Sequence, residues 1–170
     1  MNDFNESSIL ITGAGGLLGT AQVRSLLNRN AKLIALDVDQ TALDRLCGEF
    51  EAETGMGRLI TLTADITDPE KLREQLSGLL ESRNVQGLVN NAAVNPKVEA
   101  GLPRRNSLSG LDWPKWENEL KVGLFGAYNC SLIIGEHMLG HGLPSSVVNL
   151  SSDYGHLAPK QSLYFDGTSN

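Results

Sequence analysis

The sequence has little cysteine, no excess of basic residues and no long apolar run. Its two cysteines, Cys47 and Cys130, lack the spacing of a metal-binding or redox pair, so we expect two small buried side chains in a reducing cytoplasm. The 14 Lys and Arg against 20 Asp and Glu give a net charge of −6. Because like charges repel, this balance argues against binding to nucleic acid or to an anionic membrane surface.

Two further absences concern targeting. No apolar stretch approaches the roughly 18 residues that a membrane-spanning helix needs, and the first residues have neither the basic start nor the apolar core of a secretory signal. We therefore expect a cytoplasmic protein with no membrane partner and no nucleic-acid partner. The chain does have 41% hydrophobic residues over 170 positions, which predicts one domain (1–170) with a buried core.

Short apolar runs alternate with segments of helical periodicity along the chain. The runs are rich in Ile, Leu and Val, and we expect five strands, at Ser8–Thr12, Lys32–Leu36, Leu59–Thr63, Gly87–Val89 and Ser146–Leu150. Because both faces of these runs are apolar, helices should cover the sheet above and below. The alternation of strand and helix predicts the α/β class, with a doubly wound parallel sheet in three layers.

One long helix is expected from Asp112, a candidate cap, to His141. Apolar residues lie on two of its faces, which predicts packing on the sheet and on something else, such as a partner subunit. His137 and His141 are one turn apart, a spacing that suits a metal. With one other histidine in the chain, we interpret them instead as helix-end residues that favour the dipole. The stretch Val94–Leu111 is expected to be a loop near the ligand edge of the sheet.

The first strand and the first helix are joined by a glycine-rich turn. The segment Thr12–Gly19 has four glycines within seven residues, more than a tight turn alone needs. Such a turn lets the backbone approach a pyrophosphate, and it points the N–H groups of a helix N-terminus at the phosphates. The turn therefore predicts a dinucleotide site.

Asp37 follows the second strand, 24 residues after Gly13, where an acid is expected to bind the adenosine ribose. A 2′-phosphate beside this carboxylate would be repelled by roughly 4 kcal/mol, at about 4 Å and an effective dielectric constant near 20. No Lys or Arg follows closely to offset the charge. The cofactor predicted is NAD in preference to NADP. The alternative for Asp37 is a simple turn acid.

Four segments in order resemble the short-chain dehydrogenase/reductase family. They are the turn with Gly13, Gly16 and Gly19, Asp65–Asp68, Asn90–Ala93 and Asn149–Gly155. The glycine spacing is more typical of the extended members of the family. Asn90–Ala93 resembles its NNAG motif with Ala in the last place, and Asn149–Gly155 resembles its NISSxxG motif. These last two favour the classical branch.

The resemblance implies a Rossmann-type fold with a defined set of site residues. The implied cofactor-binding residues are Gly13, Gly16, Leu18 and Gly19 at the glycine turn, Asp37 at the ribose, Asp65 and Ile66 at the adenine, and Asn91 and Ala92 at the nicotinamide half. The implied catalytic residue is Ser152, matching the serine that positions and polarises the substrate oxygen. No metal site is implied.

Two departures from the family pattern affect the proton path. Gly123 stands where the family has a catalytic Asn, so any relay is expected to be altered. The family's Tyr-x-x-x-Lys pair is absent, since Tyr164 is followed by Thr168. A tyrosine near its free pKa of about 10 is a poor base without a neighbouring cation. We expect the true pair to lie beyond Asn170, in a part of the fold that this chain lacks.

The sequence thus predicts an NAD-dependent oxidoreductase that transfers hydride between nicotinamide and a small carbonyl or alcohol substrate held at Ser152. By resemblance we expect a homo-oligomer, a dimer or a tetramer. This chain alone is expected to be incomplete for catalysis. Two alternatives stay open: a noncatalytic NAD-binding sensor module, favoured by the absent pair and Gly123, and a nucleotide-sugar epimerase or dehydratase, favoured by the glycine spacing alone.

Overall fold

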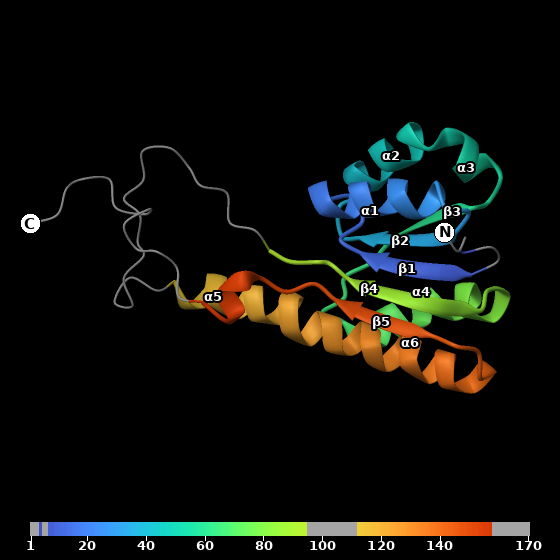
Figure 1. Cartoon of the computed structure of the whole chain (residues 1–170). Helices are drawn as coiled ribbons and strands as arrows, with labels where there is room; N and C mark the ends of the chain where they lie inside the picture. The colour runs from blue at the N-terminus through green and yellow to red at the C-terminus, as the bar shows by residue number, and fades with distance from the viewer. Residues whose placement is uncertain (1–3, 5–6, 95–111, 158–170) are drawn as a thin grey trace, which may run out of the picture.

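The computed structural model describes residues 4, 7–94 and 112–157, and its centre is a five-stranded parallel sheet (Figure 1). The strands are β1 (Ser8–Thr12), β2 (Lys32–Asp37), β3 (Leu59–Thr63), β4 (Val85–Asn90) and β5 (Ser146–Asn149). Their order in the sheet is β3-β2-β1-β4-β5, and every neighbouring pair is parallel. Because the order reverses beside β1, the prediction of a doubly wound sheet is confirmed.

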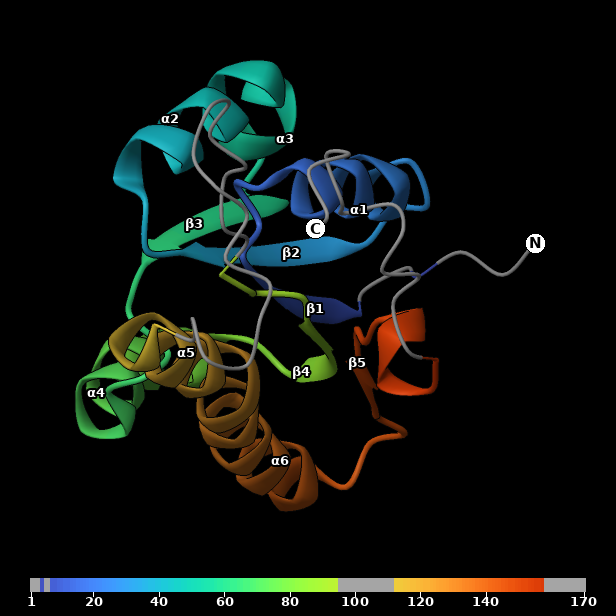
Figure 2. The same ribbon diagram turned by 90° about the vertical axis from the view of Figure 1, so that its left-hand side faces the viewer.

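Helices cover both faces of the sheet (Figure 2). On one face are α1 (Leu17–Leu27), α2 (Gln40–Glu49) and the short α3 (Glu51–Gly55). On the other are α4 (Pro69–Ser82), η2 (Lys121–Gly126) and α6 (Ala127–His141). Helix α5 (Trp113–Leu120), which has no buried residue, precedes η2 and extends beyond the end of the sheet (Figure 1). A single 3-10 turn, η3 (Asp153–Gly155), follows β5.

Side chains of the strands alternate between two apolar layers. In β1, Leu10 packs with Leu72 of α4 and Ile134 of α6, whereas Ile9 and Ile11 pack on the α1 and α2 side. Leu10, Ile11, Leu72 and Ile134 have no exposed surface, and burial of one such side chain is worth about 1.5–3 kcal/mol. The helix stripes expected from sequence therefore face the sheet.

Aspartates begin three of the helices. Asp39 caps α2 by accepting the N–H of Thr41 at 2.9 Å. Asp68 and Asp112 cap α4 and α5, each accepting the N–H three residues on, at 3.1 and 3.3 Å. The cap expected at Asp112 is confirmed, and each such cap stabilises its helix by about 1 kcal/mol.

The expected long helix is helical throughout but is not a single α-helix. Its middle, η2, is π-helical over six residues and lies against the loop after β3. A Cβ added at Gly126 would lie 2.5 Å from Cδ1 of Ile66, so only glycine allows this close approach. Periodicity alone did not predict the π-helix, because η2 continues the apolar pattern of the flanking turns.

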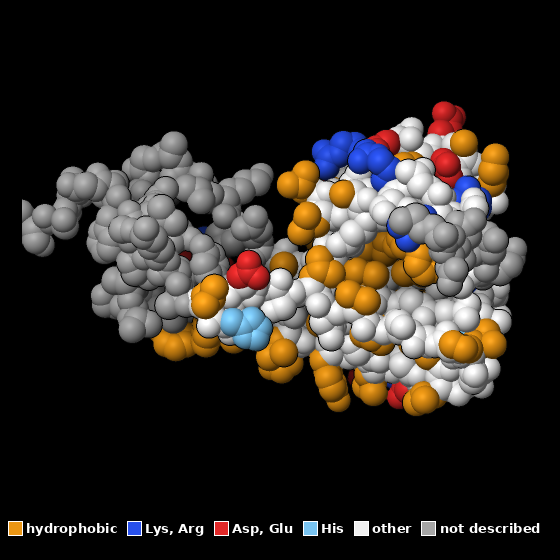
Figure 3. All heavy atoms as spheres, in the orientation of Figure 1, with side chains coloured by type: hydrophobic (Ala, Val, Ile, Leu, Met, Phe, Trp, Pro, Cys, Tyr) orange, Lys and Arg blue, Asp and Glu red, His pale blue; other side chains and the backbone are white. Residues whose placement is uncertain are grey.

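The outer face of this helix remains apolar and exposed, as the sequence predicted. Figure 3 shows apolar side chains along the lower edge of the molecule, over α5 and α6. The exposed residues include Trp113, Trp116, Leu124, Tyr128 and Leu132. Within the described ranges, no helix has the length and apolarity to cross a bilayer.

Candidate functional site

The carboxyl ends of the five strands bring the sequence-predicted residues to one edge of the sheet (Figure 1). The glycine turn follows β1, Asp37 ends β2, Asp65 follows β3, Asn91 follows β4 and Ser152 follows β5. Since all strands are parallel, these ends share one edge, which is where open α/β sheets bind ligands.

The glycine turn excludes side chains at both of its ends. Gly13 has a φ of +64°, and a Cβ there would lie 2.8 Å from Cα of Ala92. At Gly19 a Cβ would overlap the carbonyl oxygen of Gly13. The turn therefore needs glycine at both ends, because neighbouring backbone fills the space on its inner side.

Helix α1 opens directly out of this turn. Gly16 is its N-cap and supplies no side-chain hydrogen bond to it. The first N–H groups of an α-helix have no partner within the helix, and the macrodipole adds partial positive charge there. The side chains of Leu17 and Leu18 are exposed, at 90% and 61%, so α1 begins with an apolar rim beside its N–H groups. The arrangement fits an anion lying against backbone.

Asp37 is hydrogen-bonded to the glycine turn. Its Oδ2 accepts the N–H of Gly15 at 2.9 Å, and its Oδ1 accepts the N–H of Asp39 at 3.0 Å. Gly15 is itself tightly packed, because a Cβ there would lie 2.5 Å from Cβ of Ala42. The prediction had not assigned a role to Gly15, although its place between the motif glycines was a signal. The carboxylate and the turn thus form one rigid unit.

The side chain of Asn91 forms hydrogen bonds within the protein and does not point into an open site. Its Nδ2 donates to the carbonyl oxygens of Thr12 and Gly13, at 2.9 and 3.1 Å, and its Oδ1 accepts from Gln22 Nε2 at 3.3 Å. The backbone N–H groups of Asn91 and Ala92 both donate to Thr12 Oγ1 at 3.1 Å. Asn91 therefore fixes β4 to the glycine turn, and it is the backbone around Ala92 that faces Gly13.

The segment after β3 separates into an exposed and a buried residue. Asp65 is exposed and accepts both the N–H and the hydroxyl of Thr67, each at 2.8 Å. Ile66 is only 5% exposed, and its carbonyl accepts from Asn129 Nδ2 at 2.9 Å. Asp65 is therefore accessible at the ligand edge of the sheet, whereas the side chain of Ile66 packs against Gly126 of η2.

A second amide network holds the end of β5 near the end of β4. Asn90 Nδ2 donates to Asn149 Oδ1 at 2.8 Å and to Ser131 Oγ at 3.0 Å. Ser152 is exposed three residues later, and its carbonyl accepts the N–H of Gly155 at 2.9 Å. The serine therefore stands on a short turn anchored to the sheet. The sequence motifs contained Asn90 and Asn149 but assigned them no role.

Gly123 lies exposed in η2, and an added Cβ would meet no atom within 4 Å. The position can therefore hold a larger side chain without collision. Tyr164 and Thr168 lie outside the described residues, and so does the expected loop apart from Val94.

The histidines and cysteines were also considered as metal ligands or redox groups, and the described residues support neither role. In the described ranges, no group of three or more His, Cys, Asp or Glu side chains is arranged to hold a metal ion. Cys47 and Cys130 are free, and burial raises the pKa of the Cys130 thiol to about 12. A thiol with that pKa is unreactive at neutral pH.

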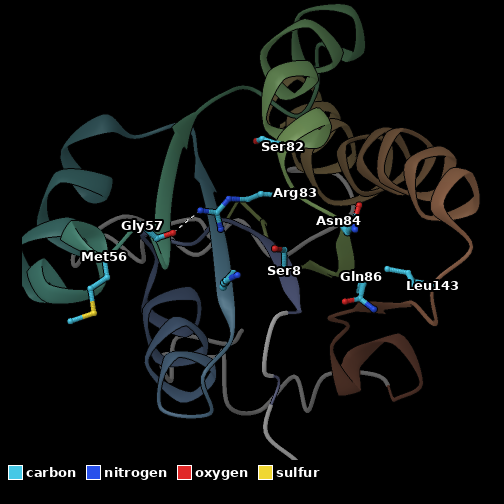
Figure 4. Close-up of a pocket in the computed structure, with 9 residues that line it drawn as sticks. Ser8, Met56, Gly57, Ser82, Arg83, Asn84, Gln86 and Leu143 are labelled. Atoms are coloured by element: carbon cyan, nitrogen blue, oxygen red, sulfur yellow. Dashed lines mark hydrogen bonds between the residues drawn. The ribbon is translucent and has the colours of Figure 1, made fainter.

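A hollow of about 610 Å³ lies at the opposite edge of the sheet, where the strands begin (Figure 4). Its lining includes Lys32 and Arg83, and Arg83 donates to the carbonyl of Gly57 at 2.6 Å. Nearby, Arg58 donates to the carbonyl of Leu27 at 2.5 Å. Helices α1 and α3 end near this edge, and the two arginines donate to the last carbonyl of α1 and to a carbonyl just beyond α3, where cations are favoured by the helix dipole.

Comparison with known proteins identifies the family. The family model described as short chain dehydrogenase matches residues 7–165. The chain belongs to the short-chain dehydrogenase family. It is 28% identical over 146 residues to 2-dehydro-3-deoxy-D-gluconate 5-dehydrogenase of Bacillus subtilis, which covers 84% of this chain and 52% of that protein. It is also 28% identical over 147 residues to 3-oxoacyl-[acyl-carrier-protein] reductase of Thermotoga maritima, covering 86% of this chain and 55% of that one.

Solved structures of the family have the same fold. A short chain dehydrogenase/reductase from Burkholderia phymatum in complex with NAD superimposes with a TM-score of 0.80 at 26% identity. The match covers 94% of this chain and 53% of that one. The chain thus spans about half the length of the family members it matches.

Proposed function

We propose that this chain is the cofactor-binding part of an NAD-dependent oxidoreductase, which transfers hydride between nicotinamide and a small carbonyl or alcohol substrate. The hydrogen bond from Gly15 to Asp37 carries the proposal, because it joins the glycine turn and the acid into one preformed unit. The solved relative with bound NAD supports it. The names of the curated relatives, a dehydrogenase and a reductase, favour hydride transfer over sugar-nucleotide epimerisation.

The residues present fit a dinucleotide. The pyrophosphate would lie against the N–H groups at the start of α1, with Leu18 beside it and the turn from Gly13 to Gly19 beneath it. Asp65 would face the adenine. Ile66, Asn91 and Ala92 would shape the site from behind, since Ile66 is buried and Asn91 holds the turn.

Asp37 would bind the ribose hydroxyls. Each of its oxygens accepts one backbone N–H, and a carboxylate oxygen has a second lone pair with which to accept another. The carboxylate is therefore able to bind a ribose diol without breaking the turn. A 2′-phosphate in the same place would meet the negative charge of Asp37, which supports NAD over NADP.

On the substrate side, Ser152 would donate its hydroxyl hydrogen bond to the substrate oxygen, orienting the carbon that exchanges hydride with the nicotinamide. The bound nicotinamide supplies the hydride chemistry. The exposed Ser152 stands on the turn before η3, so the chain positions its hydroxyl through backbone bonds. Gly123 offers no side chain for a proton relay, so a relay here would use backbone or water.

Equilibrium titration with NADH and NADPH, followed by nicotinamide fluorescence, tests the cofactor proposal. We expect the full chain to bind NADH at least about tenfold more tightly than NADPH, because even a third of the estimated repulsion suffices. Asp37→Asn should remove most of this preference. Asp44→Asn is the matched control, since Asp44 is an exposed acid that bonds to Gln40 on α2.

Equal affinity of the wild type for the two cofactors, or a preference unchanged by Asp37→Asn, would contradict the assignment. The noncatalytic alternative rests on Gly123 and on the missing Tyr-x-x-x-Lys pair. It predicts the same binding with no turnover of any alcohol or carbonyl substrate by the protein that contains this chain.

We also propose a homo-oligomer in the cytoplasm. The exposed apolar face of α5 and α6 supports self-association, and two unpaired cysteines suit a reducing compartment.

A further inference from the structure

Two histidines of α6 make polar contacts with the backbone of Val85, the first residue of β4. His137 Nε2 accepts the backbone N–H of Val85 at 3.1 Å. His141 Nε2 contacts the carbonyl oxygen of the same residue at 3.2 Å. The two rings meet edge to face with centroids 4.8 Å apart. Both polar groups of the Val85 backbone are thus bound to imidazoles, where β4 starts beside a register shift in its pairing with β1.

The partners of the two rings require opposite tautomers. Because His137 Nε2 accepts a hydrogen bond, it carries no proton, and a neutral ring must be protonated at Nδ1. His141 Nδ1 accepts the N–H of Leu143 at 3.2 Å, so its proton is on Nε2, where it donates to Val85. The backbone of one residue therefore defines both tautomers. Protonation of His137 at Nε2 would set two N–H donors against each other.

The surroundings of His137 disfavour its charge. Burial lowers the pKa of His137 below its ordinary value of 6.5, His141 lowers it further, and a contact with the backbone of Arg83 acts in the opposite direction. The sequence predicted both histidines to be helix-end residues that favour the dipole, and for His137 the structure adds a hydrogen bond from Val85. His137 is an acceptor, and acceptance requires the neutral ring.

Other ionisable groups near the pair have partners of their own. On the helices packed together here, Arg73 of α4 pairs with Glu136 of α6 at 2.7 Å. On the segment before α6, Lys121 pairs with Glu117 at 2.9 Å. The guanidinium of Arg83, which precedes β4, donates to the carbonyl of Gly57. The strand from Val85 to Asn90 has no ionisable side chain.

We propose that His137 and His141 form a pH-sensitive clasp on Val85, which holds the start of β4 only while His137 is neutral. The far end of β4 leads to Asn91, which ties the strand to the glycine turn. The clasp therefore secures one end of the strand whose other end fixes the candidate site. This proposal goes beyond the oxidoreductase proposal and does not depend on it.

Nitrogen-detected NMR of the histidine rings in the full chain tests the geometry directly. The chain has three histidines, so three ring systems need assignment. At neutral pH we expect His137 in the Nδ1–H form and His141 in the Nε2–H form. His156, exposed in the turn after β5, serves as the internal reference. If His137 and His141 share one tautomer, or if His137 is protonated at neutral pH, the clasp does not exist.

Urea unfolding from about pH 8 to about pH 5 tests the switch. Native protein with neutral His137 binds fewer protons than unfolded protein below pH 6.5, so stability is fully present above that pH and falls as the pH is lowered. His137→Gln retains an acceptor that does not titrate. It should remove a slope of up to about tenfold in the unfolding constant per pH unit.

His156→Gln is the matched control and should leave the slope as in the wild type. An identical slope for wild type and His137→Gln overturns the switch even if the tautomers are as expected. Hydrogen exchange of the Val85 amide gives an independent measure. After correction for the intrinsic exchange rate, the protection of this amide in the wild type should decrease as the pH is lowered from about 8 to about 5. Protection that does not change with pH would also contradict the proposal.

Discussion

Asp37 has a structural task as well as its proposed binding task. Its two carboxylate oxygens accept N–H groups from Gly15 and Asp39, so the side chain is oriented before any ligand arrives. An amide at this position would present an NH₂ group to one of these N–H donors. Asp37→Asn therefore weakens the turn as well as removing charge. For this reason the ratio of NADH to NADPH affinity, rather than either affinity alone, reports on the charge.

The glycines of the chain differ sharply in what a side chain would cost. Gly19→Ala should destabilise the fold by about 1–3 kcal/mol, because the new methyl group would overlap the backbone carbonyl of Gly13, which has no room to move. Gly48→Ala is the control, at an exposed position of α2 where a Cβ meets nothing within 4 Å. It should stabilise α2 by about 0.5–1 kcal/mol. Chemical denaturation of both variants provides the measurement.

Equal effects of these two substitutions would show that the turn is not packed as described. If Gly19→Ala leaves stability unchanged but weakens NADH binding, glycine is needed at this position only for binding the ligand.

Among the elements, the π-helical η2 is the one that links the two sides of the candidate site. It lies between α5 and α6, contains Gly123 and rests through Gly126 on Ile66. Helical segments with wider turns occur often at functional sites. Here the close contact with Ile66 joins η2 to the loop that carries Asp65. The packing of this element thus connects Asp65, the residue proposed to face the adenine, to the segment that contains Gly123.

A double-mutant cycle tests that contact. Gly126→Ala should cost about 1–3 kcal/mol, because its Cβ would lie 2.5 Å from Cδ1 of Ile66. Ile66→Ala alone should cost about 2–5 kcal/mol through the cavity it leaves. In the Ile66→Ala background the cost of Gly126→Ala should largely vanish, which gives a coupling energy of about 0.5–3 kcal/mol by equilibrium unfolding. Additive costs would mean that the two residues do not touch.

For the molecule as a whole, the unusual feature is how much apolar surface stays exposed. In the segment from α5 to α6, six large apolar side chains are between 42% and 65% exposed: Trp113, Trp116, Leu124, Phe125, Tyr128 and Leu132. Strand β5, at the end of the sheet, is exposed along its four residues. Contiguous apolar surface of this kind marks an interaction site in soluble proteins. The matches cover only 52% and 53% of two family members, so these proteins have further chain that this sequence does not match.

Self-association through the helical face is testable by sedimentation. Leu124→Glu or Tyr128→Glu should shift the full chain toward monomer, because a buried unpaired carboxylate is costly at an apolar contact. Met56→Glu, at an exposed position after α3, is the control and should leave the assembly unchanged. If the wild type is monomeric at every concentration, or if all three variants behave alike, the helical face is not the interface.

Much of the fold was predictable because it follows from local patterns. The apolar runs located the five strands of the described sheet, and the cap at Asp112 was correctly predicted. Strand β4, however, begins at Val85 and not at Gly87, since its bulge and histidine contacts involve residues distant in sequence. The same limit applies to the candidate site. Its residue types could be found by motif, but not the contacts that each side chain makes.

The sequence by itself determined the class of fold, the edge of the sheet at which the motifs gather and the negative charge of Asp37 at the end of β2. Spacing and residue type suffice for these, because alternation sets the layers and parallel strands share one carboxyl edge. Tertiary structure alone decided that Asn91 and Ile66 support the site from within the protein. It also decided that Gly15 binds Asp37 and that His137 accepts a hydrogen bond. Each of these depends on atoms that only packing brings together.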